Sequence, residues 1–266
     1  MHYEELFNLA PTFVKDNLCL LAFGGSISYG VNTDESDVDL IGFCIPPKKF
    51  IYQDNIITGF DSPLIFDMFT TEKIIDGTKH DISISSLARL AKLAYDGNPN
   101  ALEVIFTMDE YVVQENQIGT RVRDLSPLFL SKNAVYKCLG YARSEIGQVK
   151  KRKGKWDSCE NVEIPRTNLH EMYGYDTKSA AHSVRLLDNA MSMIVNHDVI
   201  SDYNKMFIRS IREGNFTYEE ILSMVETKMR KVEDEVEKCS LTKAPDFDFI
   251  KKKLSEIFHD FYLTHD

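Results

Sequence analysis

The chain has 266 residues, 43% of them hydrophobic and 27% charged, which suffices for one large or two modest domains with a substantial core. Its net charge of −10 excludes a protein that coats nucleic acid non-specifically with its whole surface, so any nucleic-acid contact must use a local basic patch. Five scattered cysteines give no zinc spacing, and without a signal peptide or a long apolar run we expect a cytoplasmic protein with no membrane segment.

The N-terminal segment predicts a helix followed by a buried strand. Residues 2–15 carry apolar side chains at helical spacing, with Pro11 near the middle. Residues 18–23 are all apolar and are followed by two glycines, a pattern typical of a buried strand.

The turn after this strand, Gly24-Gly25-Ser26, has the composition of a phosphate-binding turn. Glycines let the backbone approach a ligand closely, and N–H groups that lead towards a helix attract anions. The Ser26 hydroxyl can donate to a phosphate oxygen.

A second apolar run, which ends at Pro46, opens with Ser36-Asp37-Val38-Asp39 and so carries two carboxylates at its start. Asp37 and Asp39 are separated by one residue, so on a strand both side chains point to the same face. Adjacent carboxylates repel each other, which favours a cation between them, and hard cations such as Mg²⁺ prefer oxygen ligands. Together with the turn, the pair describes a site for a metal-bound nucleoside triphosphate.

Two other interpretations of this stretch are weaker. An acidic hairpin loop leaves two Asp residues in an apolar strand unexplained. A P-loop needs a Lys-Ser/Thr pair after its glycines, and this chain has none there.

The spaced elements Gly25-Ser26, Tyr29-Gly30 and Ser36-Asp37-x-Asp39 resemble the signature of the polymerase-β-like nucleotidyltransferase superfamily. The resemblance implies that Gly25, Ser26, Tyr29 and Ser36 belong to the nucleotide site. It also implies that Asp37, Asp39 and a third carboxylate on a later strand hold two Mg²⁺ ions, with Mn²⁺ as a substitute.

Asp81 is the candidate for the third carboxylate. Residues 64–73 predict a strand, and residues 80–85 alternate polar and apolar side chains as a half-buried strand does. In the superfamily that it resembles, the third metal-binding carboxylate lies on a later strand, at about this point along the chain. The alternative interpretation of Asp81 is a solvated side chain at the start of a strand. Asp67 and Asp76 are the other candidates for the third carboxylate.

Residues 97–103, GNPNxLE, follow a predicted helix that Ser85 or Ser86 can cap. This stretch resembles a narrower group, the RNA-ligase-associated predicted nucleotidyltransferases (RlaP). Glu103 lies in a short predicted helix, where it either accepts a hydrogen bond from the site or caps local backbone.

From residue 126 the chain becomes helical, and we place a domain boundary near residue 125. Five of the six residues 150–155 are Lys or Arg, and Trp156 follows them. Such a basic island can bind nucleic acid, with the indole stacked on a base. We favour a solvated surface loop with a half-buried Trp156, because one aromatic side chain beside a run of charges is weak evidence.

Residues 173–196 predict a helix that Asp176 or Thr177 caps. Four polar residues of this helix share one face at i, i+4, i+7 and i+11: Lys178, His182, Arg185 and Asn189. Cations on one face suit a site for triphosphate or nucleic-acid phosphate. The pattern YDxKxAxHxxRLL again resembles the RlaP group, which implies that this helix contributes to the nucleotide site. The alternative is an ordinary polar face with Arg185 paired to Asp188.

We therefore expect an α+β protein in two parts. Residues 1–125 form a polymerase-β-like nucleotidyltransferase domain with a small mixed sheet, and residues 126–266 form an all-α helical domain. The expected reaction transfers a nucleotidyl group from an NTP to an acceptor hydroxyl, with an RNA or tRNA end as the leading acceptor. Protein or small-molecule acceptors remain open, as does a non-catalytic, antitoxin-like regulator with the same fold.

Overall fold

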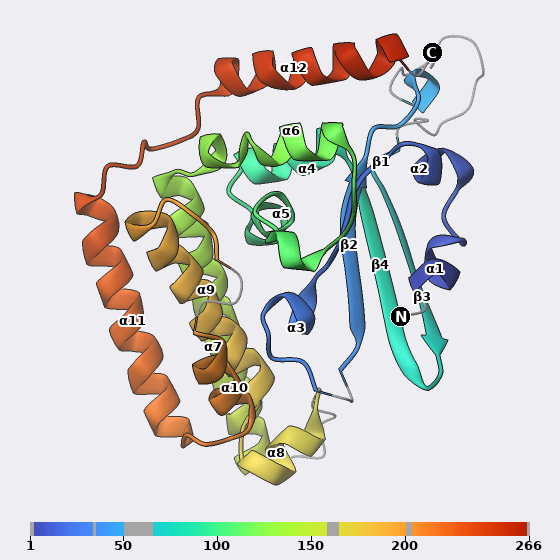
Figure 1. Ribbon diagram of the computed structural model, residues 1–266. Coiled ribbons are helices and arrows are strands. Elements are labelled where there is room, and N and C mark those ends of the chain that lie inside the picture. Colours follow the sequence, from blue (N-terminus) through green and yellow to red (C-terminus); the bar gives the residue numbers. More distant parts are fainter. Residues whose placement is uncertain (1–2, 34–35, 51–65, 159–164, 201–203, 265–266) are drawn as a thin grey trace, which may run out of the picture. The chain divides into compact units, whose positions relative to one another are not determined.

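A computed structural model describes most of the chain, namely residues 3–33, 36–50, 66–158, 165–200 and 204–264 (Figure 1). Its contacts divide the chain into two compact units. Unit 1 comprises Met1–Asp96, Asn100–Phe129 and Pro245–Asp266, and unit 2 comprises Gly97–Pro99 and Leu130–Ala244.

Unit 1 contains a five-stranded mixed sheet with the order β3-β4-β2-β1-β5. Neighbouring strands run antiparallel except β2 and β4, which are parallel. The strands are β1 (Leu18–Phe23), β2 (Val38–Cys44), β3 (Met68–Ile75), β4 (Thr78–Ser86) and β5 (Val112–Glu115). The first two residues of the strand predicted at 64–73 lie outside the described residues.

One face of this sheet packs on the N-terminal helices α1 (Tyr3–Phe7) and α2 (Thr12–Asp16). The predicted single helix is divided in two at Pro11, which directly precedes α2 and has no N–H to continue a helix. The core on this side joins helix and strand side chains, among them Leu6, Val14, Leu40, Ile82 and Ile84. Because strand side chains alternate, the neighbours Asp39, Asp81 and Ser83 project from the opposite face.

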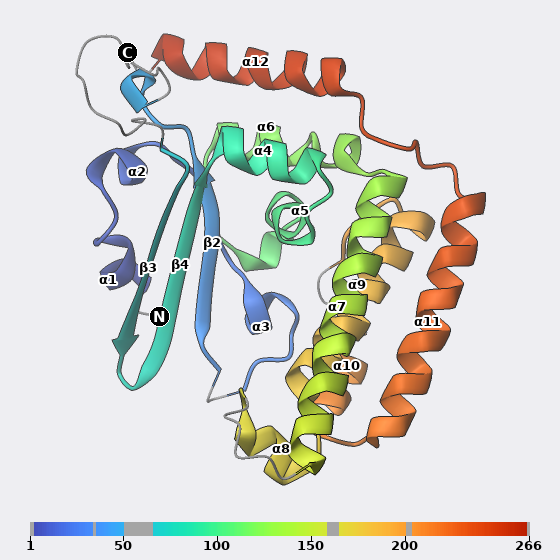
Figure 2. The ribbon, with the colours of Figure 1, turned by 180° about the vertical axis from the view of Figure 1, so that it is seen from behind.

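The remaining helices of unit 1 follow the strands or close the chain (Figure 2). They are α3 (Gly25–Ser28), η1 (Lys48–Phe50), α4 (Leu87–Tyr95), α5 (Pro99–Ile105), η2 (Asp109–Tyr111), α6 (Gln117–Arg123), η3 (Ser126–Phe129) and α12 (Phe247–Thr264). The Ser86 side chain caps α4, accepting from the Arg89 N–H as the sequence predicts.

The last helix belongs with unit 1, although it lies beyond the expected boundary at residue 125. Arg121 of α6 pairs with Asp260 of α12 at 2.9 Å. The Tyr262 hydroxyl donates to the Pro46 carbonyl at 2.7 Å. The compact units therefore differ from the expected two-part division at the C-terminus.

The regular elements among the described residues of unit 2 are all helices: α7 (Lys132–Asp157), α8 (Thr167–Tyr173), α9 (Thr177–Val195), α10 (Lys205–Arg212) and α11 (Tyr218–Lys238). Helix α9 is almost fully buried and packs on α7, where the Ser183 hydroxyl donates to the Ala142 carbonyl at 3.0 Å. The predicted fold class, a small mixed sheet with helices followed by an all-α part, is confirmed. No described helix combines the length and apolar character that a bilayer span requires.

Candidate active site

The parallel pairing of β2 and β4 brings two of the predicted acids together. Asp39 and Asp81 are register partners across these strands. Strands in a sheet lie about 4.8 Å apart, and directly paired residues project to the same face. Glu72 of β3 is the register partner of Asp81 on its other side. A row of three carboxylates therefore crosses three neighbouring strands, with Asp39 and Asp81 half-buried.

The rival acids lie outside this row. Asp67 is exposed before β3 and pairs with Arg89 at 3.7 Å. Asp76 occupies the turn between β3 and β4 with a φ of 50°. Asp37 is half-buried and directly precedes β2, one residue before the strand begins and two before Asp39.

The glycine turn lies directly against Asp39. The Gly24 N–H donates to the Asp39 carbonyl at 2.9 Å. A Cβ atom added to Gly25 would lie 1.8 Å from Oδ2 of Asp39, and Gly25 has a φ of 55°. Only glycine tolerates both that backbone conformation and that approach. The turn predicted to bind phosphate and the acid predicted to hold the metal are thus neighbours.

Helix α3 continues this turn and is tied to α5. The partly buried Ser26 lies in its first turn, and its carbonyl accepts from the Val31 N–H at 3.0 Å. The Tyr29 hydroxyl donates to Oε2 of Glu103 at 2.5 Å. The Glu103 side chain therefore accepts a hydrogen bond from Tyr29, a residue of the motif, which is the first of the two roles considered for it.

Ser36 makes a local turn with Thr33. Its Oγ accepts from the Thr33 N–H at 2.9 Å, and its own N–H donates to the Thr33 carbonyl at 3.0 Å. These two bonds hold Ser36 in a turn directly before Asp37.

Lys79 adds a cation that the sequence analysis missed. Its Nζ lies 2.8 Å from Oε2 of Glu72 and 3.2 Å from Oδ2 of Asp81. Hydrogen bonds to Glu72 and then to Asp81 raise the pKa of Lys79, so the side chain stays charged at neutral pH. The hydrogen bond from Lys79 in turn lowers the pKa of Glu72. The alternation of residues 79, 81 and 83 was the available signal, since it places Lys79 on the Asp81 face.

The donor set suits a hard cation, but its side chains are not gathered around a common centre. Among the described residues, no group of three or more His, Cys, Asp or Glu side chains is placed to hold a metal ion. Asp39 and Asp81 offer oxygen ligands from one row, as Mg²⁺ prefers. The Lys79 ammonium, however, pairs with Oδ2 of Asp81 and so competes with a cation for that oxygen.

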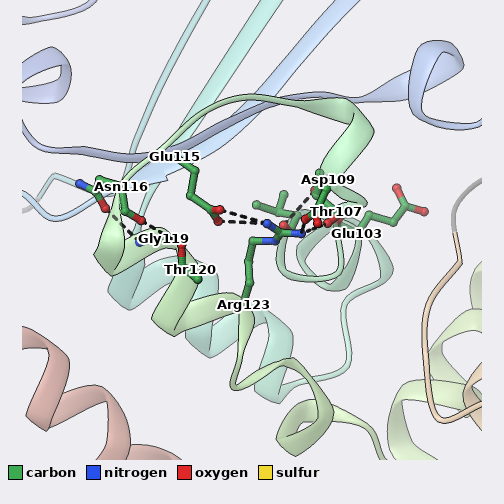
Figure 3. Close-up of polar contacts among 9 residues, drawn as sticks. Glu103, Thr107, Asp109, Glu115, Asn116, Gly119, Thr120 and Arg123 are labelled. Carbon is green, nitrogen blue, oxygen red and sulfur yellow. Dashed lines mark hydrogen bonds and ion pairs between the residues drawn. The ribbon is translucent and has the colours of Figure 1, made fainter.

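Arg123 holds the segment that carries Glu103, a second feature that the sequence analysis missed (Figure 3). From α6 its Nη2 donates to the Thr107 carbonyl at 2.5 Å and to Asp109 at 2.7 Å. Its Nη1 lies 3.1 Å from Oε1 of Glu115 on β5. The Thr107 hydroxyl caps the end of α5, donating to the Glu103 carbonyl at 2.9 Å. Arg123 therefore fixes the C-terminal end of α5 against β5 and α6.

Helix α9 of unit 2 carries the predicted polar face. Lys178 is exposed in its first turn, whereas Arg185 is only 4% exposed. Nη2 of Arg185 lies 2.9 Å from Nδ1 of His182. Asp188 accepts from Lys228 of α11 at 2.5 Å. The face is thus divided between an exposed lysine and a buried arginine that lies beside the half-buried His182.

The basic island is helical, which corrects the prediction of a surface loop. Residues 150–156 form part of α7. Lys153 pairs with Asp157 at 2.5 Å, and the half-buried Trp156 packs against His170 with ring centroids 5.6 Å apart. Arg152 pairs with Asp176, the N-cap of α9. These contacts favour a structural role for Lys153 and Trp156.

Comparisons with known proteins match nearly the whole chain to one family. The family model described as "RlaP: RNA repair pathway DNA polymerase beta family" matches residues 12–265. A curated relative, an uncharacterized 38.9 kDa protein in the nrdC-mobD intergenic region of Enterobacteria phage T4, is 29% identical over 129 residues. That match covers 48% of this chain and only 37% of the phage protein.

A search of solved structures gives a distant neighbour. It is the crystal structure of a nucleotidyltransferase-like protein from Exiguobacterium sibiricum 255-15, with 10% sequence identity and a TM-score of 0.30. The alignment covers 89% of this chain and 72% of that one.

Proposed function

Because the chain belongs to the RlaP family, the RNA repair branch of the polymerase-β nucleotidyltransferases, we propose that it is a metal-dependent enzyme that moves a nucleotidyl group from an NTP to an acceptor hydroxyl. One observation carries the proposal within the described residues. Asp39 is the register partner of Asp81 and also touches the Gly25 turn. The two proposed metal ligands and the turn proposed to bind phosphate therefore meet at Asp39, which supports the proposal.

Asp37, Asp39 and Asp81 are the proposed ligands of two Mg²⁺ ions. When bound, such ions stabilise the attacking and leaving oxygens of an in-line displacement. Gly25 and Ser26 hold the triphosphate through backbone N–H groups and the hydroxyl. Asp81 accepts the proton of the acceptor hydroxyl while the oxygen of that hydroxyl forms its bond to the α-phosphorus. The bond between the α-phosphorus and the bridging oxygen breaks, and pyrophosphate leaves.

Lys178, His182 and Arg185, all on α9, are the remaining proposed nucleotide-binding residues. Lys178 is exposed and can meet an anion directly. Arg185 is buried beside His182. We therefore propose that Arg185 orients the His182 side chain on α9 and does not extend into solvent to contact an anion. The Tyr29 and Ser36 side chains shape the motif through Glu103 and Thr33.

An RNA or tRNA end is the proposed acceptor, and the family description is its support. The test incubates the protein with radiolabelled NTPs, Mg²⁺ and total cellular RNA, then separates RNA from protein. Label in RNA supports the proposal, and label in protein supports protein nucleotidylation.

Asp39→Asn is the decisive variant, and Asp67→Asn is its matched control because Asp67 is an exposed acid outside the row. The Asp39 variant should lose transfer by at least about 10³-fold, as expected when metal-assisted charge stabilisation is removed. Asp67→Asn should remain active.

One observation favours the non-catalytic regulator. Lys79 already pairs with Asp81, and the described acids form no assembled metal site. Wild-type protein that transfers no label, and that shows no Mg²⁺-dependent change in NTP binding, would exclude the enzyme and support that regulator.

A further inference from the structure

The face of β3 and β4 that carries Asp81 also carries a cavity. Its volume is about 430 Å³, and its lining residues are Thr70, Thr71, Glu72, Asp81, Ile82 and Ser83. Four of these form two neighbouring register pairs, Thr70 with Ser83 and Glu72 with Asp81. Because side chains alternate along a strand, all four project to the face that carries Asp39, the register partner of Asp81 on β2.

This cavity lies at one end of the row of carboxylates. β3 is the edge strand of the sheet and β4 is its neighbour, so the cavity continues the row away from β2 (Figure 1). Asp81, the proposed base, belongs both to the row and to the cavity lining. A group bound in the cavity therefore lies beside the carboxylate that is proposed to take up the proton of the acceptor.

The lining favours a ligand that carries hydroxyl groups. Thr70 and Ser83 offer hydroxyls, which both donate and accept, whereas the carboxylates of Glu72 and Asp81 accept only. Thr70 and Glu72 are exposed, and Asp81 and Ser83 are half-buried. The volume lies within the range for small-ligand sites, about 300–1,000 Å³.

The same lining does not suit a phosphate group. None of the described residues that line the cavity is a cation, and Glu72 and Asp81 repel an anion. Phosphate is bound by Arg or Lys, and the nearby Lys79 ammonium is engaged by Glu72 at 2.8 Å and by Asp81 at 3.2 Å. The triphosphate of the NTP therefore fits the Gly25 turn better, and the cavity is left for an uncharged part of the acceptor.

Glu72 and Asp81 present their carboxylates side by side. Oε2 of Glu72 and Oδ2 of Asp81 both contact Nζ of Lys79, which holds these two oxygens close to each other. A ribose at the 3′ end of a strand carries hydroxyls on two neighbouring carbon atoms. One hydroxyl can bond Asp81 while the other bonds Glu72 on the adjacent strand. A 2′-deoxyribose end offers only the first of these bonds.

We propose that Thr70, Glu72 and Ser83 form the acceptor subsite and select a strand that ends in ribose. The 3′-hydroxyl bonds Asp81 and gives up its proton there, and the 2′-hydroxyl donates to Glu72. Thr70 and Ser83 bond the other oxygens of the sugar. The 2′-hydroxyl is the group by which a protein distinguishes RNA from DNA. This assignment rests on the proposed function, in which Asp81 is the base.

The test compares two short 5′-fluorescein-labelled RNA strands that differ only in the last sugar, ribose or 2′-deoxyribose. Binding is measured by anisotropy in proteins that all carry Asp39→Asn, so that no transfer takes place. Transfer to the same two strands is measured separately in proteins with the native Asp39. Glu72→Ala and Thr70→Val are the variants, and both change exposed residues whose replacement should leave the fold intact.

Two further variants are controls. Glu5→Gln is matched to Glu72→Ala, because Glu5 is an exposed acid that pairs with another lysine of the same hairpin, Lys73, at 2.8 Å. Lys79→Met tests whether Glu72 acts only by holding Lys79. Both controls keep Glu72 and Thr70, so both should keep the preference of the parent protein for the ribose end.

The parent protein should bind the ribose end about tenfold more tightly than the deoxyribose end, the scale of one hydrogen bond to a charged acceptor. Glu72→Ala should reduce this preference to about twofold or less, because the acceptor for the 2′-hydroxyl is gone. Thr70→Val should weaken binding of both ends about fivefold and keep their ratio, since Thr70 bonds oxygens that both sugars share. The transfer assay should give the same ratios in kcat/KM.

Equal affinity of the parent protein for the two ends, or no binding of either strand, would overturn the subsite. A preference that survives Glu72→Ala would overturn the role of Glu72, and a preference that is lost in Lys79→Met as well would show that Glu72 only positions Lys79. Absence of transfer with native Asp39 would contradict the proposed function instead, while the binding ratios still decide whether the subsite exists.

Discussion

The Tyr29 hydroxyl donates a 2.5 Å hydrogen bond to Glu103, a residue 74 positions further along the chain. The bond joins α3, which carries the Ser26 turn, to α5. A carboxylate acceptor makes such a bond stronger than one between neutral groups. We therefore expect Tyr29 to act as a positioning residue for the turn that is proposed to bind phosphate.

We expect Tyr29→Phe to raise the KM for NTP several-fold with a smaller change in kcat, because the turn loses its tether but keeps its donors. The unfolding free energy should fall by about 1–2 kcal/mol. Glu103→Gln, which keeps an acceptor oxygen, should have a milder effect.

Tyr136→Phe is the control for Tyr29→Phe, since the Tyr136 hydroxyl bonds Glu237 within unit 2. It should leave the KM unchanged. Steady-state kinetics and denaturant unfolding measure both quantities. Equal KM values for Tyr29→Phe and the wild type would contradict the positioning role.

Gly25 should tolerate no side chain. In Gly25→Ala the new Cβ would clash with Oδ2 of Asp39 and would force an L-residue to a φ of 55°. We expect transfer activity to fall by at least about 10²-fold, the scale of a misplaced catalytic group.

Gly77→Ala is the control that separates the effect of backbone strain from the effect of a clash with Asp39. Gly77 has a φ of 81°, but a Cβ there would meet nothing within 4 Å. This variant should lose about 1 kcal/mol of unfolding free energy through backbone strain and keep its activity. If Gly25→Ala and Gly77→Ala were equally active in the transfer assay, the contact between the Gly25 turn and Asp39 would not be needed for transfer, which would contradict the proposed role of Asp39.

Local pattern was enough to predict the strands of the motif and the face that carries the acids. The alternation over residues 80–85 identifies the Asp81 face, and the apolar runs give β1 and β2. Pro11 and Ser86 act through their own backbone or side-chain chemistry, so the break before α2 and the cap of α4 are also readable from sequence.

Contacts between distant segments could not be predicted in this way. Glu72 meets Asp81 only because β3 pairs with β4 in one particular register. Arg123 finds its partners on three segments that follow α5. The basic island was mistaken for a loop because Lys and Arg are good helix formers as well as common loop residues. Arg152 also neutralises an Asp176 that lies 24 positions away.

Lys79 should compete with the metal for Asp81. In Lys79→Met the ammonium that lies 3.2 Å from Asp81 is removed, so Asp81 becomes available as a ligand. The Mg²⁺ concentration for half-maximal transfer should fall about two- to fivefold, the scale of an exposed ion pair.

Lys73→Met is the matched control for Lys79→Met, since Lys73 is an equally exposed cation that pairs with Glu5. Its Mg²⁺ titration should match that of the wild type. A higher Mg²⁺ requirement in Lys79→Met would mean that Lys79 orients Asp81 for the metal rather than competing with it.

Arg123 should matter for stability more than any other cation of α6. Arg123→Met removes the bonds to the Thr107 carbonyl and leaves the mostly buried Glu115 without its cation (Figure 3). We expect the unfolding free energy to fall by about 2–4 kcal/mol. Arg121→Met, which breaks the exposed pair with Asp260, should cost less than about 1 kcal/mol. Urea unfolding measures both, and equal losses would contradict the role given to Arg123.

The Asp176 carboxylate should make the stability of the protein depend on acid pH. Burial alone would raise its pKa, but the Ser179 N–H, Arg166 and Arg152 outweigh burial and hold the pKa below its ordinary value of 3.8. A carboxyl with a depressed folded-state pKa stabilises fully above its unfolded value and loses that contribution as pH falls through the folded value.

Asp176→Asn isolates the charge, because Asn still caps α9 by accepting from the Ser179 N–H. Near pH 7 the variant should be about 3 kcal/mol less stable than the wild type, as expected when a buried ion pair loses one partner. This difference should stay constant down to about pH 5 and then shrink as the pH falls below the ordinary value of 3.8 toward the depressed pKa of folded Asp176. Denaturant unfolding across that range measures the difference, and a gap that does not narrow in acid would mean that the Asp176 charge is not what stabilises the start of α9.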